Sequence, residues 1–163
     1  MSEFEGLGPD AAHAWRHNNL GRLLHFAFFA FESQMLAGYH AAGFKDVRAV
    51  HLNALRHIDY RGGTRIVVMA ERAGVTKGAM GQLVEDCRQL GLVELETDAS
   101  DKRAKIVRFT ARGRRLMTVT RRAAERIEAD FEQIVGAKNY VRLRADLLAL
   151  RTAIEAGAET SDG

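Results

Sequence analysis

Cysteine and proline are nearly absent from this sequence, which has one of each in 163 residues. The single cysteine, Cys87, cannot form a disulfide within the chain, as is typical of proteins in a reducing compartment. The single proline, Pro9, lies near the amino terminus. No proline therefore interrupts the rest of the chain, which favours helices whose ends are marked by glycines.

Targeting and membrane-spanning segments are also missing. Residues 1–10 are acidic and glycine-rich, unlike the basic and apolar start of a signal peptide. The longest apolar stretch, residues 20–36, is interrupted by charged side chains and is too short to span a bilayer. We therefore expect a cytoplasmic protein with no membrane association.

Signatures of catalysis and metal binding are absent as well. The sequence has no phosphate-cradling glycine loop, nucleophile elbow or paired-cysteine cluster, so we expect no enzyme activity, cofactor or metal. His13 and His17 are spaced like two ligands on one helix face, but two ligands do not make a site. We interpret them as helix-surface residues. The composition, 47% hydrophobic and 28% charged, suits one folded domain over residues 1–163.

Apolar residues recur at helical spacing through most of the chain. Between residues 13 and 42 they cover nearly the whole predicted helix, which must therefore be covered by its own domain or by a partner chain. Five further helices are expected, at 46–60 with Asp46 as its cap, 67–73, 77–90 capped by Thr76, 110–135 capped by Thr110, and 139–156. Strands are expected at 64–66, 92–95 and 105–109, with turn chemistry at 97–101.

The middle of this order is a helix-turn-helix followed by a β-hairpin, the layout of a winged helix. We therefore predict a mainly α (α+β) fold with a winged helix-turn-helix over residues 46–109 and helical regions at 1–45 and 110–157. Residues 158–163 are predicted to be a disordered tail. In the last helix, an apolar seam alternates steps of three and four, which is typical of a helix packed along another helix. The seam consists of Tyr140, Leu143, Leu147, Leu150 and Ile154.

Two stretches of the sequence resemble the MarR-type transcription regulators. One is residues 69–84, and the other joins Gly91-Leu92-Val93-Glu94, the wing at residues 98–105 and the Thr-x-x-Gly motif at residues 110–113. The resemblance implies a homodimer held by the long N- and C-terminal helices. It implies that two recognition helices enter major grooves of a near-palindromic double-stranded DNA operator, while each wing reaches a minor groove.

The predicted helix 77–90 has two faces. Met80, Leu83, Val84 and Cys87 form the apolar face, which we expect to be buried. Glutamine can contact adenine and glutamate can accept from cytosine, while a helix N-terminus favours phosphate. The DNA-binding candidates are Thr76, Lys77, Gly78, Gly81, Gln82, Glu85 and Arg88. The alternative is a plain solvated helix face.

Basic residues cluster in and after the predicted wing. Between residues 98 and 115 there are seven basic and two acidic residues, an excess of +5 in a chain whose total is +3. Such clustering suits DNA phosphates, and an arginine at a hairpin tip suits a narrow minor groove. The candidates are Asp101, Lys102, Arg103 and Lys105, with Asp101 orienting Arg103 through a charge-assisted bond. The alternative is a charged hairpin that is merely solvated.

The resemblance also implies a small aromatic effector bound between the dimer helices and the winged helix. Residues of the first two helices would line that site: His25, Phe28, Phe29, Glu32, His51 and Leu55. An aromatic wall with few polar groups suits a phenolic ligand. Alternatively, the phenylalanines form dimer core and the histidines are satisfied structural groups. Cys87 is expected to be inert core rather than a redox switch.

These observations favour one function over two others. The first hypothesis is a ligand-responsive, sequence-specific DNA-binding regulator, a repressor in preference to an activator. The second, an enzyme, has no supporting motif. The third is a winged-helix dimer that acts through a protein partner rather than DNA.

Overall fold

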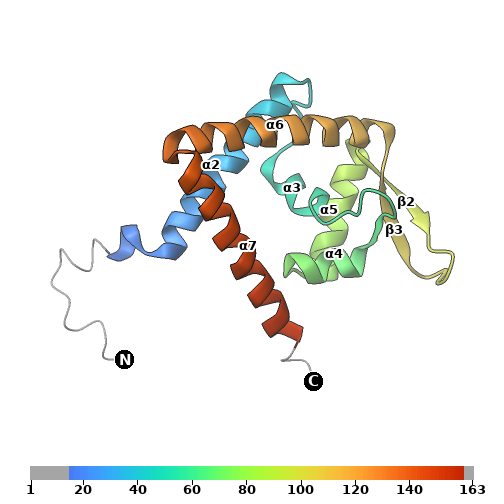
Figure 1. Ribbon diagram of the computed structural model, residues 1–163. Helices are drawn as coiled ribbons and strands as arrows, with labels where there is room; N and C mark the ends of the chain where they lie inside the picture. The colour runs from blue at the N-terminus through green and yellow to red at the C-terminus, as the bar shows by residue number, and fades with distance from the viewer. Residues whose placement is uncertain (1–14, 160–163) are drawn as a thin grey trace. The chain divides into compact units, whose positions relative to one another are not determined.

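The computed structural model describes residues 15–159, and side chains up to residue 157 (Figure 1). The helices are α2 (Leu20–Ala41), α3 (Ala49–Leu55), α4 (Ile66–Ala73), α5 (Lys77–Gln89), α6 (Ala111–Val135) and α7 (Ala137–Glu159). The strands are β1 (Thr64–Arg65), β2 (Val93–Thr97) and β3 (Lys105–Phe109). This order confirms the predicted mainly helical, winged helix-turn-helix class.

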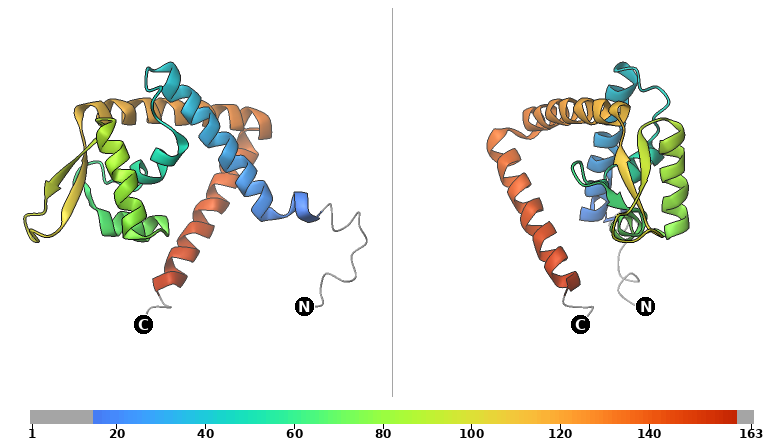
Figure 2. Two further views of the ribbon diagram at one scale, coloured as in Figure 1. Left: turned by 180° about the vertical axis from the view of Figure 1, so that it is seen from behind. Right: turned by 90° about the vertical axis from the view of Figure 1, so that its right-hand side faces the viewer.

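The three strands form one small antiparallel sheet in the order β1-β3-β2. The β2–β3 hairpin pairs Val93 with Phe109 at one end and Thr97 with Lys105 at the other. Helices α3 and α4 both pack against α5. The hairpin extends away from the start of α6, and its tip stands clear of the three short helices in Figure 1 and in the left view of Figure 2.

A close approach of two chain segments holds the start of α6 against the sheet. The backbone N–H of Thr110 donates to Leu92 O at 3.1 Å, and the Thr110 hydroxyl accepts from the N–H of Gly113 at 3.0 Å. A Cβ on Gly113 would lie 2.0 Å from Leu92 O. The Thr-x-x-Gly motif therefore supplies both a helix cap and the only side chain small enough for this contact.

Two predicted helix starts were wrong. The first long helix does not run unbroken from residue 13, because the Asn19 side chain accepts from the N–H of Arg22 at 3.1 Å and caps α2. Asp46 does not cap α3, which begins three residues later at Ala49. The Asp46 carboxylate instead accepts two 2.9 Å hydrogen bonds from Arg112.

The predicted starts of β2 and α7 were shifted by a residue or two, and the second helix is shorter than predicted, ending at Leu55 rather than near Tyr60. The caps Thr76 and Thr110 and the stops at Gly74 and Gly91 are confirmed by their hydrogen bonds and left-handed glycines. His13 and the predicted tail from residue 160 onward lie outside the described residues.

The chain divides into two compact units, one ending at residue 123 and the other starting at residue 124, within α6. The first unit holds the winged helix and α2. In the second unit, the apolar seam of α7 is exposed: Leu143, Leu147, Leu150 and Ile154 have exposed fractions of 40–63%. Within residues 15–159, no helix is both long enough and apolar enough to cross a bilayer.

Candidate nucleic-acid interface and effector cavity

The start of α5 is exposed and capped. The Thr76 hydroxyl accepts from the N–H of Ala79 at 3.2 Å, which fixes the first turn. Lys77 and Gly78 are exposed beside this cap. A helix N-terminus with an adjacent lysine and no obstructing side chain suits a phosphate group.

The opposite face of α5 is part of the core. Met80, Val84 and Cys87 are at most 1% exposed, as predicted, while Leu83 is half-buried. Burial raises the pKa of the Cys87 thiol to about 12. Since the thiolate is the reactive form, the structure favours inert packing for this cysteine over a redox role.

The polar side chains of α5 are engaged with one another. Arg88 donates two 2.8 Å hydrogen bonds to the Glu85 carboxylate and lowers its pKa. Gln82 donates to Asp86 at 2.9 Å. These exposed groups must exchange partners before they can contact base edges, which costs little because surface pairs are weak.

The base of the wing is fixed by a cluster around the buried carboxylate of Asp98. It accepts from Arg65 Nε at 2.6 Å, and from the backbone N–H and hydroxyl of Ser100 at 2.7 and 2.8 Å. Arg65, and then Ser100, hold the pKa of Asp98 well below its usual range. The cluster ties β1 to the start of the wing turn, and sequence reasoning missed it.

The tip of the wing carries two cations. Lys102 and Arg103 are exposed, and the described residues offer neither side chain an ion pair. The predicted orienting role of Asp101 needs correction, because its carboxylate accepts from the backbone N–H of Arg103 at 2.9 Å. Asp101 therefore shapes the turn and leaves the Arg103 guanidinium available to a ligand. Lys105 donates to Thr97 across the hairpin at 2.8 Å.

Three other arginines of this stretch are used within the fold. Arg108 pairs with Glu96 at 2.5 Å, and Arg112 pairs with Asp46. Arg114 donates to Phe109 O at 2.7 Å. Since Arg108 and Arg112 are neutralised by carboxylates, the count of basic residues in the sequence overstates the positive charge offered to a ligand.

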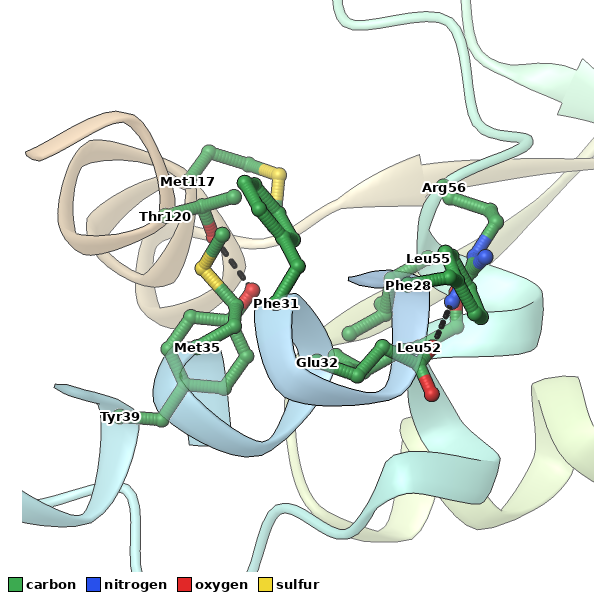
Figure 3. A pocket seen from close by; sticks show the side chains of 10 residues that line it. All are labelled: Phe28, Phe31, Glu32, Met35, Tyr39, Leu52, Leu55, Arg56, Met117 and Thr120. Carbon is green, nitrogen blue, oxygen red and sulfur yellow. Dashed lines mark hydrogen bonds and ion pairs between the residues drawn. The ribbon is translucent and has the colours of Figure 1, made fainter. Parts of the chain in front are cut away.

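A cavity of about 240 Å³ lies within the first unit, between α2, α3 and α6 (Figure 3). Its walls are mainly apolar. The lining residues are Phe28, Phe31, Glu32, Met35, Tyr39, Leu52, Leu55, Arg56, Met117 and Thr120. An engineered cavity of about 150 Å³ holds benzene, so this one has room for one ring and a short substituent.

Two polar groups stand at opposite ends of the cavity (Figure 3). At one end Arg56 pairs with Glu32, donates to Leu52 O at 3.0 Å and lies 5.3 Å from the centre of the Phe28 ring. At the other end the hydroxyls of Tyr39 and Thr120 are 2.9 Å apart, and burial raises the pKa of Tyr39. Tyr39 is therefore a neutral hydrogen-bonding group at physiological pH.

The structure brings three of the six effector-site candidates to this cavity, Phe28, Glu32 and Leu55. His25 and Phe29 are exposed on α2 and do not line it. His51 is buried outside the lining, where its Nδ1 accepts from the N–H of Arg48 at 3.1 Å. Phe31, Met35 and Tyr39 were missed, although they lie about one, two and three helical turns beyond Phe28 and share its face.

The fold and these sites define a winged helix-turn-helix protein. Residues 45–104 match the model of the MarR family, a segment that contains the helix-turn-helix and most of the wing. Over this segment the chain is similar to the MarR family, and its fold is a winged helix-turn-helix.

Solved structures of other proteins have a similar fold. Wild-type MarR from E. coli in its apo form is 19% identical, with a TM-score of 0.67 over 81% of this chain and 96% of that chain. CouR from Rhodococcus jostii RHA1, bound to p-coumaroyl-CoA, is 19% identical, with a TM-score of 0.63 over 82% and 92%. No curated protein sequence matches the chain.

Proposed function

We propose that this protein is a sequence-specific, double-stranded-DNA-binding transcription regulator that acts as a homodimer, with repression as its mode. The observation that carries this is the wing tip, where Lys102 and Arg103 face solvent without an ion-pair partner among residues 15–159, while the Asp98 cluster fixes the wing base. A positioned hairpin with unpaired cations at its tip suits a minor groove.

In this proposal α5 enters the major groove. Thr76, Lys77, Gly78 and Gly81 contact the backbone at its exposed start, and Gln82, Glu85 and Arg88 read base edges after exchanging their present partners. Lys102, Arg103 and Lys105 form the minor-groove contact, and Asp101 holds the turn that presents them. The residues at the start of α5 would position the protein on the phosphates, and the later residues of α5 would read the bases.

The homodimer is supported by apolar surface that the chain leaves uncovered. On α2, Leu20, Phe26 and Phe29 are 64–73% exposed. On α7, the seam residues Leu143 to Ile154 are also exposed. Contiguous exposed apolar side chains at helical spacing favour contact with another helix. Leu147→Asp should yield a monomer in sedimentation, whereas a variant that stays dimeric would show that the seam is dispensable.

The cavity between α2, α3 and α6 is the proposed effector site. Helix α3 contributes Leu52 and Leu55 to the cavity and packs its other side on α5. A ligand that moves α3 would therefore move the recognition helix, which supplies a physical route from ligand to DNA. The cavity is too small to contain a coenzyme A thioester like the one bound to CouR.

The test is selection of bound duplexes from random DNA by the full-length protein at moderate salt. Enrichment of a near-palindrome with half-sites one helical turn apart is the expected result. Arg103→Ala should weaken binding to the selected duplex, whereas Arg122→Ala, which removes an equal charge from the exposed face of α6, should not. A folded dimer that enriches no sequence would favour the alternative, a protein partner in place of DNA.

A further inference from the structure

The effector cavity contains charged groups but offers no unsatisfied charge. Glu32 and Arg56 neutralise each other at its rim, where their side chains are 19% and 36% exposed. Within the described part of the chain, every buried side-chain nitrogen or oxygen has a hydrogen-bond partner. Among the described residues, the cavity therefore offers a charged ligand no buried group that lacks a partner.

The guanidinium of Arg56, the positive group at the cavity rim, already makes three contacts. Arg56 is bonded to the Glu32 carboxylate and to Leu52 O, and its guanidinium lies over the Phe28 ring. A carboxylate ligand would have to displace Glu32. That exchange leaves Glu32 without its counter-ion in a mainly apolar setting, which is the costly way to break an ion pair.

The hydroxyl end of the cavity also disfavours an anion, because the hydroxyl protons of Tyr39 and Thr120 are already donated to acceptors within the protein. Thr120 donates to Leu116 O at 2.9 Å, and a threonine hydroxyl has one proton. The 2.9 Å bond between Tyr39 and Thr120 is therefore donated by Tyr39. Both hydroxyl oxygens keep acceptor capacity but have no proton left to offer, so this end can accept from a ligand O–H and cannot solvate a negative charge.

We infer that the cavity selects uncharged ring compounds over their carboxylate counterparts, and that Glu32 is the residue that sets this preference by occupying Arg56. This inference rests on the proposed effector site and specifies its ligand class: one aromatic or alicyclic ring with a short substituent, optionally carrying a hydroxyl donor. Removing the Glu32 charge frees Arg56 and should convert the cavity into an anion site.

Nitrobenzene and benzoate test this, because they have nearly the same planar shape and differ in charge. We expect the full-length protein to bind nitrobenzene at least about tenfold more tightly than benzoate in calorimetric or ligand-observed NMR titrations. In Glu32→Gln the ratio should fall to one or below. In Glu32→Gln/Arg56→Gln, which is again neutral at the rim, the preference for nitrobenzene should return.

Glu71→Gln is the matched control, since it removes one exposed carboxylate from α4 outside the cavity and should leave the ratio unchanged. Benzoate binding as tightly as nitrobenzene to the unsubstituted protein would overturn the inference while leaving the effector site intact. A ratio unaffected by Glu32→Gln would overturn the role of Glu32. Binding of neither compound would overturn the effector site as well. Melting temperatures of all variants identify any that fail to fold.

Discussion

Two arginine–carboxylate pairs in this protein have similar chemistry and different settings. At the wing base, Arg65 meets a buried Asp98 that also accepts two hydrogen bonds from Ser100. At the cavity rim, Arg56 meets a Glu32 that accepts no other bond among the described residues. The first pair is one part of a cluster and holds backbone segments together. The second is a single contact between two helices, which a change of ligand or charge can replace.

The structural role of an ion pair depends on the other bonds that its two side chains make. A carboxylate with several partners loses all of them when it is removed, and its burial leaves the remaining groups unsolvated. Glu32 has Arg56 as its one partner among the described residues, and Arg56 keeps its bond to Leu52 O when the Glu32 charge is removed. Four predictions sharpen this contrast, in order of expected effect.

Asp98→Ala should have the largest effect, because the wing loses its attachment to β1. The variant should have a lower melting temperature, and its affinity for the selected duplex should fall at least about tenfold. Gel-shift titration and amide hydrogen exchange at residues 98–104 measure the two consequences. Ser100→Ala, which removes one hydroxyl and keeps the Arg65 pair, should have a smaller effect. Unchanged exchange rates in the wing of Asp98→Ala would show that the cluster does not hold it.

Arg103→Ala should weaken DNA binding about tenfold, the scale of a charged contact of about 1.4 kcal/mol, and leave the melting temperature unchanged. The reason is that the Arg103 side chain is exposed and makes no ion pair within the described residues. The variant thus separates DNA contact from wing stability, which Asp98→Ala changes together. Equal affinity of variant and parent for the duplex at moderate salt would refute the wing-tip contact.

The Asp98 cluster should give stability a specific pH dependence. Since the folded-state pKa of Asp98 lies below its ordinary value of about 3.9, the carboxylate stabilises the fold fully above that pH and loses its contribution as pH falls further. The difference in unfolding free energy between the parent and Asp98→Asn should therefore be constant above about pH 5 and shrink below about pH 4. Denaturant titrations at several pH values measure it, and a difference that grows on acidification would contradict this assignment.

Glu32→Gln should have the smallest effect on stability, about 0.5 kcal/mol or less, because the pair is partly solvated and Arg56 keeps its bond to Leu52 O. Urea unfolding of the variant beside Glu71→Gln measures it. A loss as large as that of Asp98→Ala would show that the rim pair is structural, and that the contrast between the two pairs does not hold.

The elements of the winged helix could be predicted from the sequence because each has a local signal. Thr76 and Thr110 cap helices from the position directly before them, and Gly74 and Gly91 end helices with a left-handed residue. The exceptions were also local: Asn19 caps α2 inside an otherwise continuous apolar pattern. An asparagine inside such a pattern can face solvent or form a cap, and periodicity does not distinguish the two.

Only three of the ten residues that line the cavity were predicted. Phe28 and Glu32 were found because they share a face of one helix, whereas Arg56, Met117 and Thr120 come from other elements and carry no motif. The ion-pair partners of the arginines that follow the wing could not be predicted either. Arg112 pairs with an aspartate 66 positions away, a contact that no local pattern indicates.

The sequence by itself thus determined the order of the helices and strands, the capped helix α5 and the basic wing, because these depend on residues within a few positions of one another. The tertiary structure decided which charges remain available. It pairs Arg65, Arg108 and Arg112 with distant carboxylates and pairs Arg56 with Glu32 at the cavity. Within the described part of the chain it gives Arg103 at the wing tip no carboxylate partner. The physical reason is that a charge acts on a ligand according to its neighbours in space, and those are set by packing between segments far apart in the chain.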